Sequence, residues 1–205
     1  FLATMLQDEI NKKEFNKKIV SEIKDSLILY MKTESFLVQS NIYLRCSRPK
    51  NMKITQESES IDFHRESFYG PNMEESINIW TPIIGVSENN TLRYIPESHL
   101  IPDKEIKTIN IEDEYTKKFS NGHKLGFQYS PKKITKGVNL KKSLPMNVPL
   151  FSSSVFSGNL IHGAALNTSN SIRFSCDFRI IKKSDYTSES KKFHFASNKP
   201  YFIEY

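Results

Sequence analysis

The chain has 205 residues, 38% of them hydrophobic, and a formal net charge of +6. This length allows one sizeable hydrophobic core but is short for two domains, and the 14 Phe and 9 Tyr argue against a disordered protein. Two cysteines, Cys46 and Cys176, have no CxxC spacing, which argues against a disulfide scaffold or a zinc finger and fits a reducing cytoplasm.

The apolar segments and the first residues of the chain indicate its cellular location. No apolar run approaches the length that crosses a bilayer, so we expect no membrane partner. The chain starts at Phe1 without an initiator methionine, and its first residues become charged too soon for a signal peptide. We therefore expect a cytoplasmic protein from which residues before Phe1 have been trimmed.

Basic residues are scattered along the chain, and no signature of a nucleic-acid-binding fold accompanies them, so we expect no nucleic-acid partner. Five lysines are concentrated in one segment that also contains Pro131 and Gly137: Lys132, Lys133, Lys136, Lys141 and Lys142. This group is either a solvated loop or a cationic lid that attracts an anionic substrate.

Residues 1–34 predict a helical segment, because apolar residues recur there at spacings of four and five: Ile10, Phe15, Ile19, Ile23 and Leu27. Beyond it, short alternating or β-branched segments are separated by Asn, Gly, Pro and Ser, which is typical of strands. We expect strands over residues 36–45, 61–68, 76–86, 91–95, 148–156, 159–165 and 172–181. Many strands without alternating helices favour a mainly β sandwich or barrel.

We expect a single domain over residues 1–205. It comprises the helical segment 1–34, a β core over 35–181 and a C-terminal extension over 182–205. Residues 103–144 form an insertion in the core that is rich in charge and poor in pattern, with a short helix as one option. Such long excursions between strands are often functional.

The segment 172–181 has one apolar and one polar face. We expect its apolar face to pack against the N-terminal helix, and that face comprises Ile172, Phe174, Cys176, Phe178 and Ile180. The polar face comprises Arg173, Ser175, Asp177 and Arg179. Because His162 lies just across a turn at residues 167–170, we expect a hairpin that brings it and the polar face to one cavity.

His64 and Glu66 form a His-x-Glu pair, and on a strand both side chains would point to one face. With the distant His162, three ligands could occupy one face of an octahedral metal and leave the opposite positions open, as in a non-haem Fe(II) oxygenase. Arg173 offers a planar fork for a carboxylate such as one end of 2-oxoglutarate.

These residues carry a family resemblance. Residues 162–173 (HGAALNTSNSIR) resemble the H-G-[SA]-x-x-N-x-S-x-x-x-R signature of phytanoyl-CoA dioxygenase-like (PhyH) enzymes. Residues 92–99 (LRYIPESH) resemble the family's Pro-Gly-Ser-His element, with Glu97 in place of glycine, and Glu66 stands where the family has Asp. The resemblance covers residues 35–181. It implies a double-stranded β-helix (jelly roll, cupin-like) that binds Fe(II) and 2-oxoglutarate, uses O2 and hydroxylates a small molecule.

Two departures from the family pattern affect the expected site. The related halogenases have a small residue at the position of Glu66 so that chloride can bind iron, so Glu66 favours hydroxylation or another oxidation. Ala164 stands where many members have a serine that helps to hold the cosubstrate. Either this contact is missing or another side chain supplies it: Ser175, Asn78 or Tyr43, with Trp80 in the cavity wall or the core.

Three functional hypotheses remain open. The first is a 2-oxoglutarate-dependent hydroxylase of a small polar or anionic metabolite, such as a sugar, a sugar-nucleotide or a secondary-pathway intermediate. The second is a cupin-like metalloenzyme without 2-oxoglutarate, an isomerase or lyase, and Arg173 distinguishes the two. The third is a non-catalytic jelly-roll binding module. Substrate contacts are expected from residues 67–73, Arg93 and the insertion.

Structural roles are the alternatives for single residues. Glu66 could pair with Arg65 or Lys53, and Arg173 could pair with Asp177. His99 is expected to shape a turn at the entrance of the site and not to be a ligand.

Overall fold

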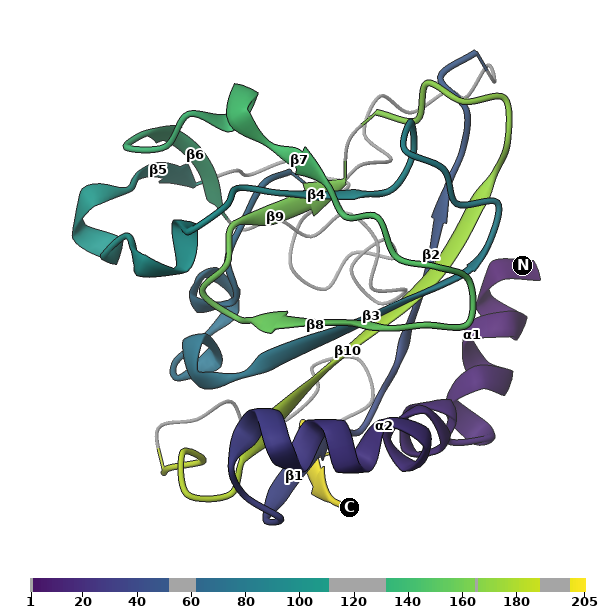
Figure 1. Ribbon diagram of the computed structural model, residues 1–205, viewed down its shortest axis with the longest axis vertical. Coiled ribbons are helices and arrows are strands. Elements are labelled where there is room, and N and C mark those ends of the chain that lie inside the picture. The colour runs from purple at the N-terminus through teal and green to yellow at the C-terminus, as the bar shows by residue number, and fades with distance from the viewer. Residues whose placement is uncertain (1, 52–61, 111–131, 165, 189–199) are drawn as a thin grey trace.

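Two antiparallel sheets form the body of the protein in the computed structural model, which describes residues 2–51, 62–110, 132–164, 166–188 and 200–205 (Figure 1). The strands of the larger sheet are β1 (Phe36–Gln39), β2 (Tyr43–Ser47), β3 (Ile77–Ile84), β8 (Ser154–Ser157), β10 (Arg173–Lys182) and β11 (Phe202–Glu204). Their order is β11-β1-β10-β3-β8, and β2 also pairs with β10.

The smaller sheet has the order β7-β4-β9 and comprises β4 (Leu92–Tyr94), β7 (Leu144–Pro145) and β9 (His162–Ala164). Its side chains meet those of the larger sheet in a shared apolar cluster, in which Trp80 of β3 and Phe156 of β8 pack with Leu92 and Tyr94 of β4. The predicted jelly roll is confirmed.

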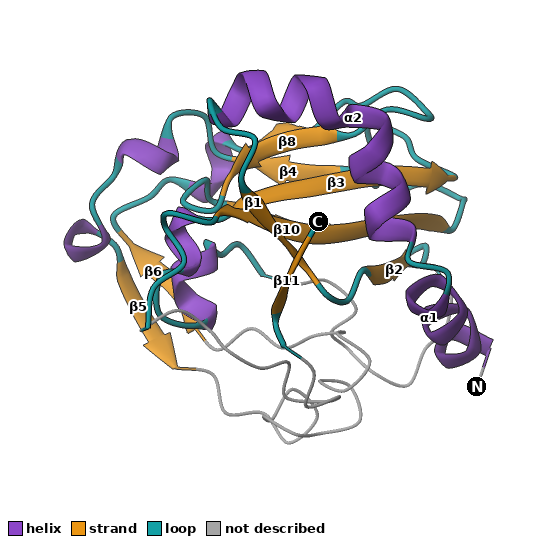
Figure 2. Ribbon diagram, turned by 90° about the horizontal axis from the view of Figure 1, so that it is seen from below, coloured by secondary structure: helices purple, strands orange, loops and turns teal. Residues whose placement is uncertain are grey.

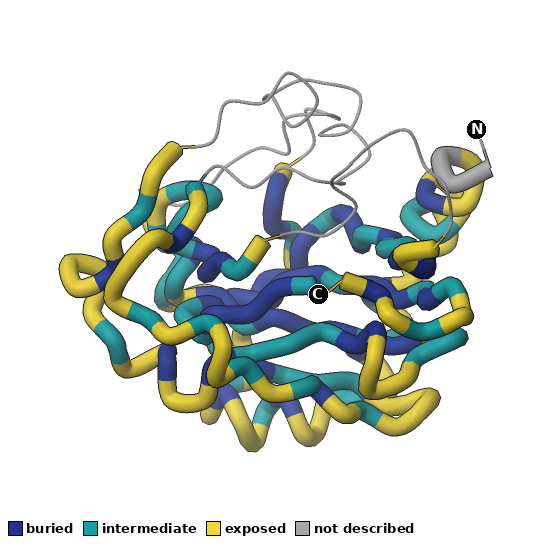
Figure 3. Tube along the Cα trace, turned by 90° about the horizontal axis from the view of Figure 1, so that it is seen from above, coloured by how far each residue is buried: buried dark blue, intermediate teal, exposed yellow. Residues whose placement is uncertain are grey.

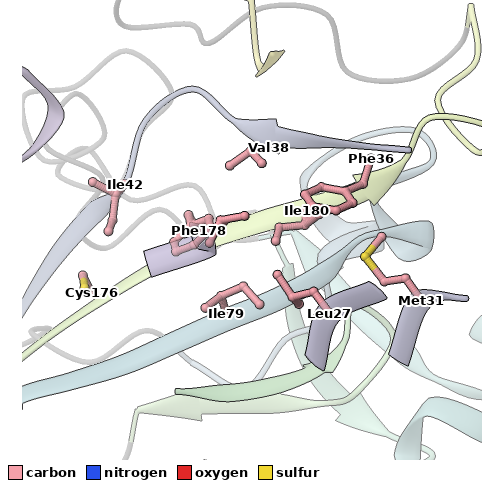
Figure 4. Packing of buried hydrophobic residues seen from close by; sticks show 10 residues of the cluster. Leu27, Met31, Phe36, Val38, Ile42, Ile79, Cys176, Phe178 and Ile180 are labelled. Carbon is pink, nitrogen blue, oxygen red and sulfur yellow. The ribbon is translucent and has the colours of Figure 1, made fainter. Parts of the chain in front are cut away.

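Two helices cover the outer face of the larger sheet. They are α1 (Leu2–Lys12) and α2 (Phe15–Met31), where the sequence predicted one helical segment. The break falls at Glu14, whose backbone is left-handed with φ 49°. Val20, Leu27 and Met31 of α2 pack in one cluster with strand residues, which confirms that the N-terminal helical segment packs on one sheet (Figures 2 and 4).

Strand β10 runs through the middle of the larger sheet, between β1 and β2 on one side and β3 on the other. Cys176, Phe178 and Ile180 lie on the face that meets α2, as its apolar alternation predicted. The buried strands lie inside, and exposed loops surround them (Figure 3). The polar face of β10 must therefore point between the two sheets.

The predicted hairpin between His162 and β10 is wrong. Strand β9 pairs with β4 in the smaller sheet, whereas β10 lies in the larger one. A turn between two strands does not require them to pair, and in a jelly roll the chain crosses from one sheet to the other at such a turn. The two segments still approach each other from opposite sheets, because Arg179 of β10 binds Glu66, whose Oε1 lies 3.7 Å from His162 Nε2.

The predicted strand over residues 61–68 is also wrong in its second half. His64 forms an isolated antiparallel bridge with His162, and Glu66 begins a 3-10 turn, η1 (Glu66–Tyr69). The predicted strand over 36–45 is likewise two strands, β1 and β2. Alternation in a short segment does not separate a strand from a turn whose side chains happen to be buried.

The insertion over 103–144 contains a two-stranded sheet that its weak pattern did not predict. Strands β5 (Lys107–Asn110) and β6 (Lys132–Lys136) pair antiparallel, and we call them the cationic ribbon. Three 3-10 turns flank its strands along the chain: η3 (Ser98–Leu100), η4 (Asp103–Glu105) and η5 (Leu140–Lys142). Another, η2 (Met73–Glu75), precedes β3. None of the described helices is long and apolar enough to cross a membrane.

Candidate metal and cosubstrate site

His64, Glu66 and His162 lie together between the two sheets. Each offers one ligand atom, these atoms lie within 4.8 Å of one another, and all three residues are buried. The Oε1 atom of Glu66 is 3.7 Å from His162 Nε2 and 4.0 Å from His64 Nε2. The sequence singled out these three residues, and the structure brings them to one point.

Backbone carbonyls fix the orientation of both imidazoles. The Nδ1 atom of His64 lies 2.7 Å from the carbonyl oxygen of Asp62, and that of His162 lies 2.9 Å from the carbonyl oxygen of Leu160. A proton on each Nδ1 satisfies these carbonyls and leaves the Nε2 lone pairs for a metal. Burial, followed by the proximity of His162, lowers the pKa of His64 to about 3, and burial also lowers the pKa of His162. Both rings are therefore neutral, the form that binds metal.

Backbone pairing holds the two histidines side by side. His64 N–H donates to His162 O over 2.9 Å, and His162 N–H donates to His64 O over 3.0 Å. Gly163 permits this close approach, because a Cβ atom there would lie 2.9 Å from both Cα and N of Phe63. The glycine of the predicted signature thus has a local steric reason.

Gly163→Ala should push the segment around Phe63 away from β9 and displace His64 with it. We expect Fe(II) affinity to fall by about tenfold, the lower end of the range for loss of a supporting contact, together with a lower melting temperature. Anaerobic calorimetry and circular dichroism measure the two effects. Gly137→Ala is the matched control, since its Cβ would meet the backbone of Glu105 in the insertion. It should lower stability and leave Fe(II) affinity unchanged; equal losses of affinity in both variants would contradict this prediction.

Among the described residues, Glu66 pairs with Arg179 and not with Arg65, one of the two partners considered from the sequence. Arg179 donates from Nε to Oε2 over 2.9 Å and from Nη2 to Oε1 over 3.0 Å. Arg65 instead donates to the carbonyl oxygens of Ser98 and Ile101 and to Asp103, and Lys53 lies outside the described residues. Burial alone would raise the pKa of Glu66, but the Arg179 guanidinium outweighs it and holds the pKa below its ordinary value.

Arg173 is buried on the polar face of β10 and is not paired with Asp177. Its Nη1 donates to the carbonyl oxygen of Asn90 over 2.7 Å, and its guanidinium lies 5.9 Å from the ring centre of Trp80. Asp177 accepts instead from Arg45 and Arg179. Burial lowers the pKa of Arg173 to about 10, so the guanidinium is still charged at neutral pH.

Four buried polar atoms on this face have no hydrogen-bond partner among the described residues: Arg173 Nε, Ser175 Oγ, Asn78 Nδ2 and Trp80 Nε1. Directly paired residues of β3 and β10 share a face, which places Asn78 opposite Arg179 and Trp80 opposite Asp177. Leaving such donors buried without partners costs free energy, so the set indicates a ligand rich in acceptors.

Tyr43 lies on the same polar face as these four unpaired donors but belongs to a different group of side chains. It is opposite Asp177 in the register of β2 and β10, and its ring lies 4.8 Å from the Arg45 guanidinium and 5.9 Å from that of Arg179. Burial raises its pKa to about 12. Its environment is the ion-pair group of Arg45, Asp177 and Arg179, and a role in holding a cosubstrate stays a prediction.

Sequence reasoning missed several groups around the site. Phe156 and Tyr69 contact the rings of His162 and His64 edge-on, and neither had a sequence signal that we could have used. Arg179 did have a sequence signal, because it lies six residues after Arg173 and therefore on the same inward-pointing polar face of the strand. His99 is exposed, in keeping with a place in a turn.

The chain belongs to the phytanoyl-CoA dioxygenase (PhyH) family, whose family model matches residues 4–175. The family implies Fe(II) and 2-oxoglutarate, and the residues fit both. Two neutral imidazoles and a carboxylate are ligands that suit Fe(II), and a buried arginine beside unpaired donors suits a dicarboxylate. No curated protein matches the sequence.

Two solved structures are similar to this chain at low sequence identity, and the first of them shares its fold. The epimerase SnoN, in complex with Fe3+, alpha ketoglutarate and nogalamycin RO, has a TM-score of 0.56 at 12% identity over 86% of this chain and 61% of that chain. EvdO2 from Micromonospora carbonacea var. aurantiaca, complexed with 2-oxoglutarate, has a TM-score of 0.46 at 14% identity over 76% of this chain and 57% of that chain. This chain thus spans less than two thirds of either.

Proposed function

We propose that the protein is an Fe(II)- and 2-oxoglutarate-dependent oxygenase that hydroxylates a small polar or anionic metabolite. One observation carries the proposal: a cluster of two histidines and one glutamate shares the space between the sheets with the unpaired buried donors around Arg173. A metal alone would use the first group and leave the second without a purpose.

His64, Glu66 and His162 would hold the iron, which together with 2-oxoglutarate and O2 supplies the oxidising chemistry. Arg173 would bind a carboxylate of 2-oxoglutarate, and Ser175, Asn78 and Trp80 would donate to its remaining oxygens. The apolar cluster around Phe156 and Trp80 would exclude water from the cavity, which strengthens these charge-assisted contacts.

The cupin-like alternative, a metalloenzyme without 2-oxoglutarate, differs in what Arg173 binds. Anaerobic calorimetry, first with Fe(II) and then with 2-oxoglutarate, tests the choice. Stoichiometric Fe(II) binding, followed by 2-oxoglutarate binding that requires the metal, supports the proposal. Metal binding without 2-oxoglutarate binding would favour the cupin-like enzyme, and no metal binding would favour the non-catalytic module.

An anionic substrate is favoured by the position of the cationic ribbon. Lys107 and Lys136 lie directly opposite each other across its two strands, a like-charge pair that destabilises the ribbon itself. The Nζ atom of Lys132 lies 5.5 Å from the ring centre of Phe68, in the same 3-10 turn as Glu66. The ribbon therefore contacts the turn that carries a proposed metal ligand, where its charge can attract an anion.

Replacing the exposed Lys133 and Lys136 of the ribbon and the exposed Lys142 of η5 with Gln should raise the KM for an anionic substrate, once a screen of sugar nucleotides identifies one that stimulates 2-oxoglutarate turnover. We expect a rise of roughly threefold or more at low salt, since each exposed charge contributes less than about 1 kcal/mol. Added salt should erase most of the difference, because exposed charges are screened within about 10 Å at 0.1 M ionic strength.

Turnover of 2-oxoglutarate without substrate should hardly change in this variant. The matched control replaces three exposed lysines of the N-terminal helical segment, Lys13, Lys18 and Lys24, which alters the net charge equally. If both triple variants raised KM alike, the effect would belong to net charge, and Lys133, Lys136 and Lys142 would form a solvated surface.

A further inference from the structure

Arg179 binds both carboxylate oxygens of the proposed metal ligand Glu66 through one edge of its guanidinium. Its Nε and Nη2 atoms bind the two carboxylate oxygens at 2.9 and 3.0 Å, and its Nη1 binds Asp177 Oδ2 at 3.2 Å. Glu66 is 0% exposed and Arg179 6%. Water therefore does not compete for this pair.

Neighbouring residues hold both the backbone and the guanidinium of Arg179 in place. Arg179 lies near the middle of β10, opposite Asn78 of β3, and its N–H donates to the side-chain Oε1 of Gln39 over 3.0 Å. Asp177 is bound in turn by Nε and Nη2 of Arg45 at 2.6 and 3.1 Å. Arg45, Asp177, Arg179 and Glu66 thus form a row of alternating charges. Among the described residues, Glu66 is the only carboxylate that joins the two imidazoles in a possible metal site.

The side chain of Glu66 needs such a constraint. It begins a 3-10 turn and is not on a strand, and a glutamate has several rotatable bonds to fix. A carboxylate oxygen can accept more than one contact, so Oε1 can bind both Arg179 and a metal, while Oε2 stays with Arg179. Oε1 is also the oxygen that lies nearest both imidazole Nε2 atoms.

We propose that Arg179 is a positioning residue of the metal centre, which holds the Glu66 carboxylate turned toward His64 and His162 before the ion binds. The inference rests on the proposed metal site. A second effect of Arg179 acts in the opposite direction, because its positive charge repels a divalent cation. If repulsion were the larger effect, removing the charge would tighten metal binding; if positioning is the larger effect, removal weakens it.

Arg179→Lys and Arg179→Met separate the two effects. Lysine keeps the charge but cannot bind both oxygens, and methionine removes both charge and fork. We expect Fe(II) affinity, measured by anaerobic calorimetry, to fall by about tenfold or more in Arg179→Met, in the range for loss of a group that orients a metal ligand. Arg179→Lys should also bind less tightly than the wild type, although its charge is unchanged. The d–d absorption spectrum of the Co(II)-loaded protein should change in both variants.

The matched control is Arg45→Lys, at the other end of the same row of charges. Arg45 binds the Asp177 carboxylate and not the proposed ligand directly opposite the imidazoles, so its replacement should leave Fe(II) affinity and the Co(II) spectrum unchanged even if it lowers stability. If Arg179→Met does not fold, Arg179→Lys carries the test. Wild-type affinity or tighter in the Arg179 variants that fold would overturn the role of Arg179 and leave the metal site standing, whereas a wild-type protein that binds no Fe(II) would overturn the site itself.

Discussion

Replacing His64 or His162 with Ala should abolish stoichiometric Fe(II) binding while the fold persists. Two of the three protein ligands remain in each variant, which is too few to hold Fe(II) against water and buffer at the concentrations of a titration. The fold should persist because Glu66 keeps its partner Arg179, so neither variant leaves a buried charge unpaired. Metal analysis after anaerobic loading measures the loss, and far-ultraviolet circular dichroism checks the fold. Unchanged iron content in both variants would refute the assignment of the ligands.

Glu66→Ala differs from the histidine variants in two respects. It leaves Nε and Nη2 of the buried Arg179 without the Glu66 carboxylate, so it should also cost stability. Both imidazoles remain in this variant, so we expect weak iron binding of less than one equivalent, an open position at which a halide can bind, and loss of hydroxylation.

Replacing Arg173 with Ala should weaken 2-oxoglutarate binding by more than tenfold and leave Fe(II) binding intact. A desolvated carboxylate that loses its guanidinium remains buried and unpaired, at a cost of roughly 2–5 kcal/mol. Arg173→Lys should recover only part of the affinity, because an ammonium group does not reproduce the planar fork. Anaerobic calorimetry with Fe(II)-loaded protein measures both.

The Fe(II) affinity of each Arg173 variant is its own control, since a general loss of structure would lower both affinities together. Equal 2-oxoglutarate affinity in the wild type and in Arg173→Ala would favour the cupin-like alternative. In that case the free Nε of Arg173 would require another acceptor.

The sequence predicted those parts of the fold in which local pattern and tertiary environment agree. Strand β10 alternates cleanly because one face meets α2 and the other faces the cavity, so both its extent and the role of its apolar face could be inferred. Strands β5 and β6 could not be predicted, because an exposed two-stranded ribbon buries little and carries lysines where alternation would need apolar residues. The division into a core, an insertion and an extension stays a prediction.

The candidate site was predictable as a set of residues and not as an arrangement. His64, Glu66 and His162 were found by type and spacing, yet the local structure assigned to Glu66 was wrong, because a turn can present a side chain as well as a strand can. The partner of Glu66 was missed for a different reason. Arg179 is distant in sequence, and its contact with Glu66 depends on the position of η1 relative to β10, which no local pattern reveals.

The backbone bridge between His64 and His162 makes the proposed ligands part of the pairing that joins distant segments of the chain. An ion held by both imidazoles would stabilise that pairing, since the two segments could not separate without releasing the ion. Mass action then adds the free energy of ion binding to the cost of local opening. Iron supply would therefore govern how long the protein resists proteolysis, as well as whether it can turn over.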